Sequence, residues 1–145
     1  LQIHHHSVQQ FQSEKKYDFI VSNPPFFNND LKSDDSKRNI ALHSTELSLE
    51  ELLAAIKINL SEQGSFAVLL PYHRSDYFIS LCLNENFYLS EIIKVKQTPA
   101  HNYFRSILFF NRKENNIKEK EIIIQHNNEY TIDFIELLKD YYLYL

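Results

Sequence analysis

The sequence predicts an α/β protein whose central sheet is mostly parallel, with an antiparallel edge strand. Residues 17–22 and 65–70 are nearly continuous apolar runs, the pattern of strands that are covered on both faces. Residues 49–60, between them, carry leucine and isoleucine at helical spacing. Strands that alternate with helices are typical of the α/β class, in which ligands bind beyond the carboxyl ends of the parallel strands.

The segments around the first buried strand are short or polar. Residues 1–6 are expected to form a short strand, and residues 8–11 a brief helical turn or a loop. The strand at residues 17–22 is followed by two prolines, which cannot continue a ladder of backbone hydrogen bonds. Residues 27–39 are rich in Asn, Asp, Ser and Lys and predict a loop.

Two helices are predicted in the middle of the chain. Ser48 and Glu51 have the spacing of a capping box at the start of the first helix, and Gly64 is expected to cap its end. Pro71 ends the following strand, and a second helix is predicted at residues 75–86. The side chains expected to point inward from that second helix are Phe78, Leu81 and Cys82.

The last third of the chain predicts strands followed by a helix. Residues 88–98 and 104–111 are expected to form an antiparallel pair joined by a short turn. Polar residues 113–120 predict a linker or hairpin loop, residues 121–126 one more strand, and residues 131–142 an amphipathic helix.

Composition narrows the class of protein. With 145 residues, 43% of them hydrophobic, the chain fits one domain with a sizeable core. It has no apolar run of about 20 residues and no signal-peptide pattern, so we expect a cytoplasmic protein with no membrane partner. The single cysteine, Cys82, excludes an internal disulfide and is expected to fill the core. A net charge of -4 is unusual for a nucleic-acid binder, although Lys37-Arg38 and Arg112-Lys113 are local basic spots.

The tetrapeptide Asn23-Pro24-Pro25-Phe26 has a chemical logic of its own. An amine on an aromatic ring is a poor nucleophile because its lone pair is delocalised, and two acceptors on its hydrogens expose that lone pair. The Asn23 side-chain oxygen and the Pro24 carbonyl can be those acceptors, since the prolines fix φ and remove competing N-H donors. Phe26 offers a face on which a base can stack. The alternative is that Asn-Pro-Pro is only a strand-terminating turn.

The apolar strand and this tetrapeptide, Tyr-Asp-Phe-Ile-Val-Ser-Asn-Pro-Pro-Phe, resemble motif IV of the Rossmann-like methyltransferases that act on adenine N6 or glutamine amides. Ala41-Leu42-His43, the segment at 64–71 and the tail ending in Tyr142-Leu143-Tyr144 resemble, within that group, the bacterial tRNA1(Val) adenine-37 N6-methyltransferases. The resemblance implies that residues 1–145 are the C-terminal portion of one methyltransferase domain, with residues 113–145 as an additional strand and helix tail. The lack of methionine and the start at Leu1 agree with a portion of a longer protein.

The resemblance also implies residue roles. Catalysis would depend on Asn23, Pro24, Pro25 and Phe26. The cofactor, S-adenosyl-L-methionine, would contact Ser7, Val8 and Asn23, and the tRNA substrate would contact Phe26, Phe27, Arg38 and His43. The chain departs from the family pattern at three points: it lacks the glycine-rich cofactor loop, it has Ser7 where an acidic residue is common, and it has Leu42 where relatives often carry arginine.

Histidines and aromatic residues also have simpler interpretations. His4 and His6 would share one face of a strand, but no Cys, Asp or Glu lies at ligand spacing, so we expect no metal site. His73 and Arg74 follow Pro71 at the expected site edge of the sheet, without a demand for catalysis. Most of the aromatic residues are expected in the core, including Phe66, Phe78, Phe104, Phe109 and Phe110.

The sequence therefore favours an enzyme that methylates N6 of an adenine in tRNA. Two alternatives stay open: a protein-glutamine N5-methyltransferase, whose amide nitrogen poses the same chemical problem, and a non-catalytic interaction module. In either enzyme the motif would work by placing the nitrogen in line with a methyl sulfonium, without a strong general base.

Overall fold

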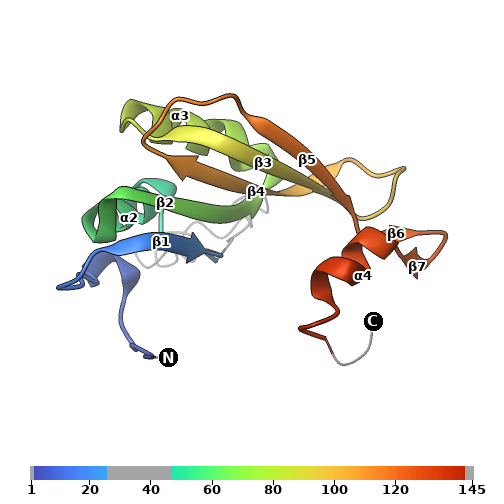
Figure 1. Cartoon of the computed structure of the whole chain (residues 1–145), viewed down its shortest axis with the longest axis horizontal. Coiled ribbons are helices and arrows are strands. Elements are labelled where there is room, and N and C mark those ends of the chain that lie inside the picture. The colour runs from blue at the N-terminus through green and yellow to red at the C-terminus, as the bar shows by residue number, and fades with distance from the viewer. Residues whose placement is uncertain (1, 26–46, 143–145) are drawn as a thin grey trace, which may run out of the picture.

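The computed structural model describes residues 2–25 and 47–142, and its main body is one five-stranded sheet (Figure 1). The order in the sheet is β1-β2-β4-β3-β5. β1 is parallel to β2 and β3 is parallel to β5, whereas β4 is antiparallel to both of its neighbours. The strands are β1 (Tyr17–Ser22), β2 (Leu60–Pro71), β3 (Tyr88–Lys96), β4 (Tyr103–Asn111) and β5 (Lys118–Ile123).

This arrangement confirms the α/β class, the mostly parallel sheet and the antiparallel strand pair predicted from the sequence. The antiparallel strand, however, is not outermost. β4 returns from β3 and inserts beside β2, where it pairs over Phe66 to Pro71, and β5 then adds to the free side of β3. The position of β4 follows from the hairpin, because a short turn obliges the returning strand to lie next to β3.

Helices α2 (Leu49–Asn59) and α3 (Ser75–Asn84) supply the buried side chains that pack against one face of the sheet. The capping box is confirmed: the Glu51 backbone N-H donates to Ser48 Oγ at 3.1 Å, and the Ser48 N-H donates to a Glu51 carboxylate oxygen at 2.8 Å. The expectation that Gly64 caps this helix is wrong. The helix ends at Asn59 because Leu60 is already extended, with φ -80° and ψ 141°, and Gly64 lies inside β2.

The core between helices and sheet is centred on four aromatic rings. Phe66 stacks on Phe110 with ring centroids 5.0 Å apart, and Phe78 and Phe87 meet these two rings edge-on. All four are fully buried, as is Cys82 beside them, which confirms the expected role of this cysteine. Burial raises the pKa of its thiol. The core also holds a buried hydrogen bond of 2.6 Å between two hydroxyls, those of Ser75 and Ser106.

Not every predicted core position is buried. Phe104 is 42% exposed, because it lies at the start of β4 beyond the cover of α3, so its assignment to the core was wrong. The expectation that β1 is covered on both faces was also wrong for the described residues. Phe19 and Val21 on β1 are 51% and 70% exposed, since α2 and α3 cover only the opposite face.

β5 begins three residues before the predicted strand. The polar residues of β5 pair with β3 through three surface ion pairs: Lys94 with Glu119 at 2.7 Å, Lys96 with Glu121 at 3.0 Å, and Lys120 with Glu91 at 2.7 Å. Cross-strand pairs of opposite charge favour strand structure where hydrophobic periodicity gives no signal.

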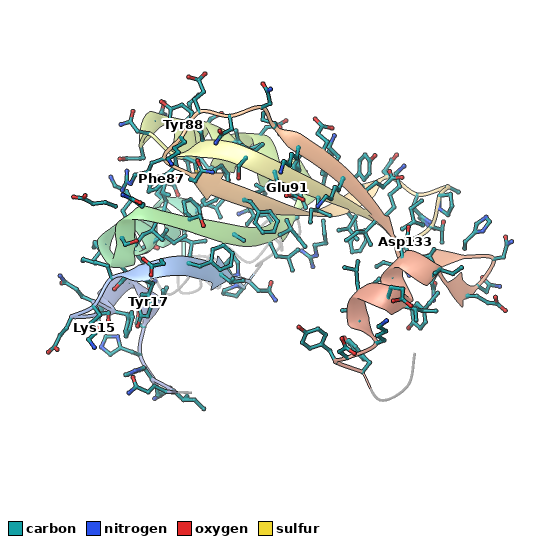
Figure 2. The ribbon with its side chains drawn as sticks, in the orientation of Figure 1. Lys15, Tyr17, Phe87, Tyr88, Glu91 and Asp133 are labelled. Carbon is teal, nitrogen blue, oxygen red and sulfur yellow. The ribbon has the colours of Figure 1, made fainter. Side chains whose placement is uncertain are left out.

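The C-terminal part forms a small unit beyond β5 (Figure 1). β6 (Gln125–His126) and β7 (Glu129–Tyr130) are joined by two asparagines with positive φ, 51° at Asn127 and 67° at Asn128, as a tight hairpin turn of this kind requires. Helix α4 (Ile132–Leu138) follows, with Thr131 as its N-cap, and is shorter than predicted. Figure 2 shows Asp133 in its first turn.

The N-terminal segment contains η1 (Val8–Gln10), which confirms the predicted helical turn. The strand predicted at its start was wrong: residues 2–7 adopt no regular structure, because they have no neighbouring strand with which to pair among the described residues. In the described part of the chain, no helix combines the length and apolar character that crossing a bilayer requires.

Candidate functional site

The Asn-Pro-Pro motif lies directly after β1, at the carboxyl end of the strand. Asn23 and Pro25 are exposed, whereas Pro24 between them is buried. A buried proline with fixed φ holds its own carbonyl and the preceding residue in one position. The structure therefore places Asn23 as an exposed residue on backbone that the buried Pro24 anchors, at the end of β1.

The register of the sheet locates this end of β1 relative to the other strands. Ser22 pairs with Val68 of the parallel strand β2, so Asn23 and the end of β2 at Pro71 lie at the same edge of the sheet. Lys96 at the end of β3 and Tyr103 at the start of antiparallel β4 reach the same edge. We call it the carboxyl edge, and it is where α/β proteins place their ligands.

Four of the predicted site residues lie outside the described residues: Phe26, Phe27, Arg38 and His43. Their roles remain predictions. The three candidate cofactor contacts, Ser7, Val8 and Asn23, are described and exposed. Ser7 is the N-cap of η1, its hydroxyl donates to the Gln9 side-chain oxygen, and Val8 is 38% exposed.

Asn59 ties this N-terminal segment to the end of α2. Its side-chain oxygen accepts from the Ser13 N-H at 2.8 Å, and its amide nitrogen donates to the carbonyls of Phe11 and Ala55, both at 2.9 Å. Asn59 is 4% exposed, so these partners replace water. The sequence analysis missed this residue, although a polar side chain three positions after Ile56 on the apolar face of the helix was an available signal.

Ser7 and Val8 fit only one part of S-adenosylmethionine. An exposed hydroxyl at Ser7 and an apolar side chain at Val8 suit the adenine end, since the hydroxyl can accept from an amine and the valine can lie against a ring. A glycine-rich turn that lets backbone approach a cofactor is missing from the sequence. The only glycine, Gly64, lies within β2, where an added Cβ would come within 2.8 Å of the Leu60 side chain.

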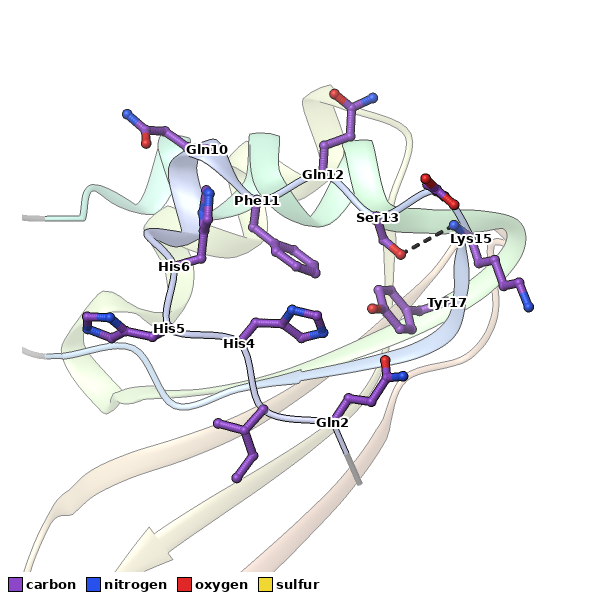
Figure 3. Close-up of a pocket in the computed structure, with 12 residues that line it drawn as sticks. Gln2, His4, His5, His6, Gln10, Phe11, Gln12, Ser13, Lys15 and Tyr17 are labelled. Atoms are coloured by element: carbon purple, nitrogen blue, oxygen red, sulfur yellow. Dashed lines mark hydrogen bonds between the residues drawn. The ribbon is translucent and has the colours of Figure 1, made fainter.

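A cavity of about 840 Å³ opens beside the N-terminal segment, and its lining does not include Ser7, Val8 or Asn23. The rings of His4 and His6 lie beside the Phe11 ring, with centroids 5.7 and 6.2 Å from it, and Tyr17 also lines the cavity (Figure 3). In the residues that the structure describes, no three His, Cys, Asp or Glu side chains gather as metal ligands would.

The carboxyl edge also carries an aromatic and charged cluster that the sequence analysis missed. Tyr72 follows β2 and lies 5.0 Å from Tyr103, ring centroid to ring centroid. The Tyr103 hydroxyl donates to Glu121 at 2.6 Å, and the ammonium groups of Lys94 and Lys96 lie 5.8 and 4.6 Å from the Tyr103 ring. The available signal was a tyrosine directly after Pro71, at the expected site edge, and a second tyrosine directly before the predicted strand at residues 104–111.

Comparison with known proteins agrees with this architecture, although no family model matches the chain. The protein named tRNA1(Val) (adenine(37)-N6)-methyltransferase in Pseudoalteromonas translucida is 37% identical over 145 residues, which are 99% of this chain and 62% of the relative. Proteins of the same name from Flavobacterium johnsoniae and Dyadobacter fermentans are 36% and 38% identical, each over 96% of this chain and 61% and 60% of the relative. The chain is homologous to these methyltransferases.

The homology confirms the resemblance predicted from the sequence. The chain spans about three fifths of the length of these relatives. Among solved structures, a predicted O-methyltransferase from Agrobacterium tumefaciens superimposes with a TM-score of 0.58 at 13% identity, over 86% of this chain and 51% of that one. This likeness shows the Rossmann-like methyltransferase fold.

Proposed function

We propose that the chain takes part in transferring a methyl group from S-adenosylmethionine to N6 of an adenine in tRNA, as an enzyme. The observation that carries the proposal is the position of exposed Asn23 beside the buried Pro24, at the carboxyl edge of a methyltransferase-like sheet. The names of the relatives support the choice of adenine and of tRNA. A tRNA loop offers unpaired adenines whose faces and edges are free.

In this proposal the Asn23 side-chain oxygen and the Pro24 carbonyl each accept one hydrogen of the adenine N6 amine. Phe26, two residues after Pro24, stacks on the base. With both hydrogens held by these two acceptors, the nitrogen lone pair would be exposed toward the place where the methyl donor binds, and the proton that the nitrogen releases after transfer would pass to water. Bound S-adenosylmethionine supplies the electrophilic methyl group. Ser7 and Val8 would hold the adenine end of the cofactor, while Phe27, Arg38 and His43 would contact the RNA.

Replacement of Asn23 by alanine in the complete natural protein tests the proposal. The Asn23→Ala variant should fold normally, because the side chain is exposed, and turnover should fall about 100- to 1,000-fold, the loss seen when one preorganised polar group is removed from a transition state. Methyl incorporation into a tRNA transcript measures this. Asn115→Ala, which removes an exposed amide between β4 and β5, is the matched control and should keep full turnover.

Two results would refute the proposal. One is turnover by Asn23→Ala equal to that of the parent protein. The other is methyl incorporation into a glutamine-containing protein substrate and none into tRNA, which would assign the same motif to amide methylation.

A further inference from the structure

Tyr72 and Tyr103 form a half-buried pair of rings at the carboxyl edge, with Lys94 and Lys96 above Tyr103; we call this group the tyrosine-lysine cluster. The two ring planes are tilted by 46°, so neither ring covers the face of the other. The Lys96 ammonium lies 4.6 Å from the Tyr103 ring centroid and within 3.0 Å of a Glu121 oxygen. One face of the Tyr103 ring therefore lies against a lysine ammonium that is itself paired with a carboxylate.

The position of the cluster follows from the strand order. Tyr72 follows β2, which is the neighbour of β1, and Tyr103 begins β4, which is the next strand. Neighbouring strands lie about 4.8 Å apart, so Tyr103 lies about 10 Å along the carboxyl edge from the end of β1 and Asn23. A chain of nucleotides bound at Asn23 and continuing along this edge would pass over the cluster.

The chemistry of the cluster suits a nucleotide. Aromatic rings stack on bases of any sequence, and an ammonium binds a phosphate. The lysines are paired with Glu119 and Glu121, whose side chains are 63% and 39% exposed. Ion pairs at a surface contribute only about 0 to 1 kcal/mol, so a phosphate can replace a carboxylate at little cost. Hydrogen bonding to Glu121 raises the pKa of Lys96.

We propose that the tyrosine-lysine cluster binds a nucleotide of single-stranded RNA that flanks the target adenine. Its base stacks on Tyr72 or Tyr103, and its phosphate pairs with Lys96 and Lys94. This inference rests on the proposed function, because it takes RNA as the substrate of the Asn23 site. It deepens that function by assigning to residues on β3 and β4 a part in recognising the loop around the target.

Substitution of the rings tests the stacking. In the complete natural protein, Tyr72→Ala and Tyr103→Ala should each weaken binding of a tRNA transcript about 5- to 150-fold in fluorescence anisotropy, the range expected for one lost stacked base. In methylation assays KM for the transcript should rise by a similar factor, whereas kcat at saturating RNA should stay within about twofold, because the cluster does not touch the reacting amine. Tyr103→Phe keeps the ring and should bind like the parent protein.

Two further variants make the test sharper. Tyr77→Ala removes an exposed tyrosine from α3 and should leave RNA binding unchanged. Lys96→Ala should reduce the slope of log Kd against log salt by about 0.7, the value for one phosphate contact on single-stranded nucleic acid. Tyr72→Leu and Tyr103→Leu fill more of the vacated space, so they keep the test valid if an alanine variant unfolds.

The outcomes separate this inference from the proposed function. If the parent protein methylates tRNA while all ring variants keep its Kd and KM, the cluster is not an RNA site and the inference is wrong. A fall in kcat of the ring variants with Kd and KM unchanged would also overturn the inference, because it would show that the rings affect catalysis through the structure and not through RNA binding. If the parent protein methylates no tRNA, the proposed function fails, and loss of RNA binding in the ring variants would still identify the cluster as a binding surface.

Discussion

Removal of the Asn59 side chain should release the N-terminal segment from the body of the protein. Asn59 makes two hydrogen bonds to this segment, with the Ser13 N-H and the Phe11 carbonyl, at 2.8 and 2.9 Å. A hydrogen bond contributes about 0.5 to 1.5 kcal/mol net, so Asn59→Ala should lower the free energy of local opening by about 1 to 3 kcal/mol. That is about a 5- to 150-fold increase in the open population.

Hydrogen exchange measures this opening directly. The Ser13 amide should exchange faster by the same factor in Asn59→Ala, because its acceptor is gone. Ile58→Ala, which shortens an exposed neighbour on the same helix, is the control and should leave the Ser13 amide unchanged. An exchange rate at Ser13 within about twofold of the parent value would refute the reasoning, since it would show that the segment is held by other contacts.

Two more predictions concern a helix start and a titrating pair. Ser48→Ala removes the acceptor of the capping box and should destabilise the protein by about 1 kcal/mol in denaturant unfolding, while a substitution at exposed Ser80 should change little. The Tyr103 hydroxyl, and then Lys96, lower the pKa of Glu121. Tyr103→Phe should therefore raise the carboxyl pKa of Glu121 in an NMR titration toward its ordinary value. In the parent protein, the hydrogen bond between Tyr103 and Glu121 adds its full stability at a pH above the ordinary carboxyl pKa, and this stability is lost as the pH falls through the lowered pKa. A pKa of Glu121 that is the same in Tyr103→Phe and in the parent protein would show that the hydroxyl does not lower it.

Local signals in the sequence located the elements that depend on local contacts. The capping box at Ser48 and Glu51 involves residues three apart, and it fixed the start of α2. The strand at Tyr17–Ser22 was located from its apolar run, and its end from the prolines after it. The edge of the sheet that carries the Asn-Pro-Pro motif could be predicted for the same reason. The motif directly follows the apolar run, so it lies at the carboxyl end of that strand.

Features that depend on distant partners could not be predicted in this way. Phe19 and Val21 have the apolar character of buried residues, yet their exposure is decided by what covers that face of the sheet. The first half of β5 carries the sequence Lys-Glu-Lys, which has no hydrophobic period, and it is a strand because charges on β3 lie opposite. The tyrosine-lysine cluster joins residues from three separate segments, so only the pairing of β2, β4 and β3 brings it together.

The single thiol of the chain gives the molecule an internal reporter. Cys82 lies on α3 with no solvent exposure, and its raised pKa keeps it in the unreactive protonated form. A disulfide reagent can therefore modify the native protein only when α3 moves away from the aromatic core. Because the sequence has no second cysteine to compete, the rate of labelling follows that one opening, and the same mixture can be compared with and without RNA or cofactor.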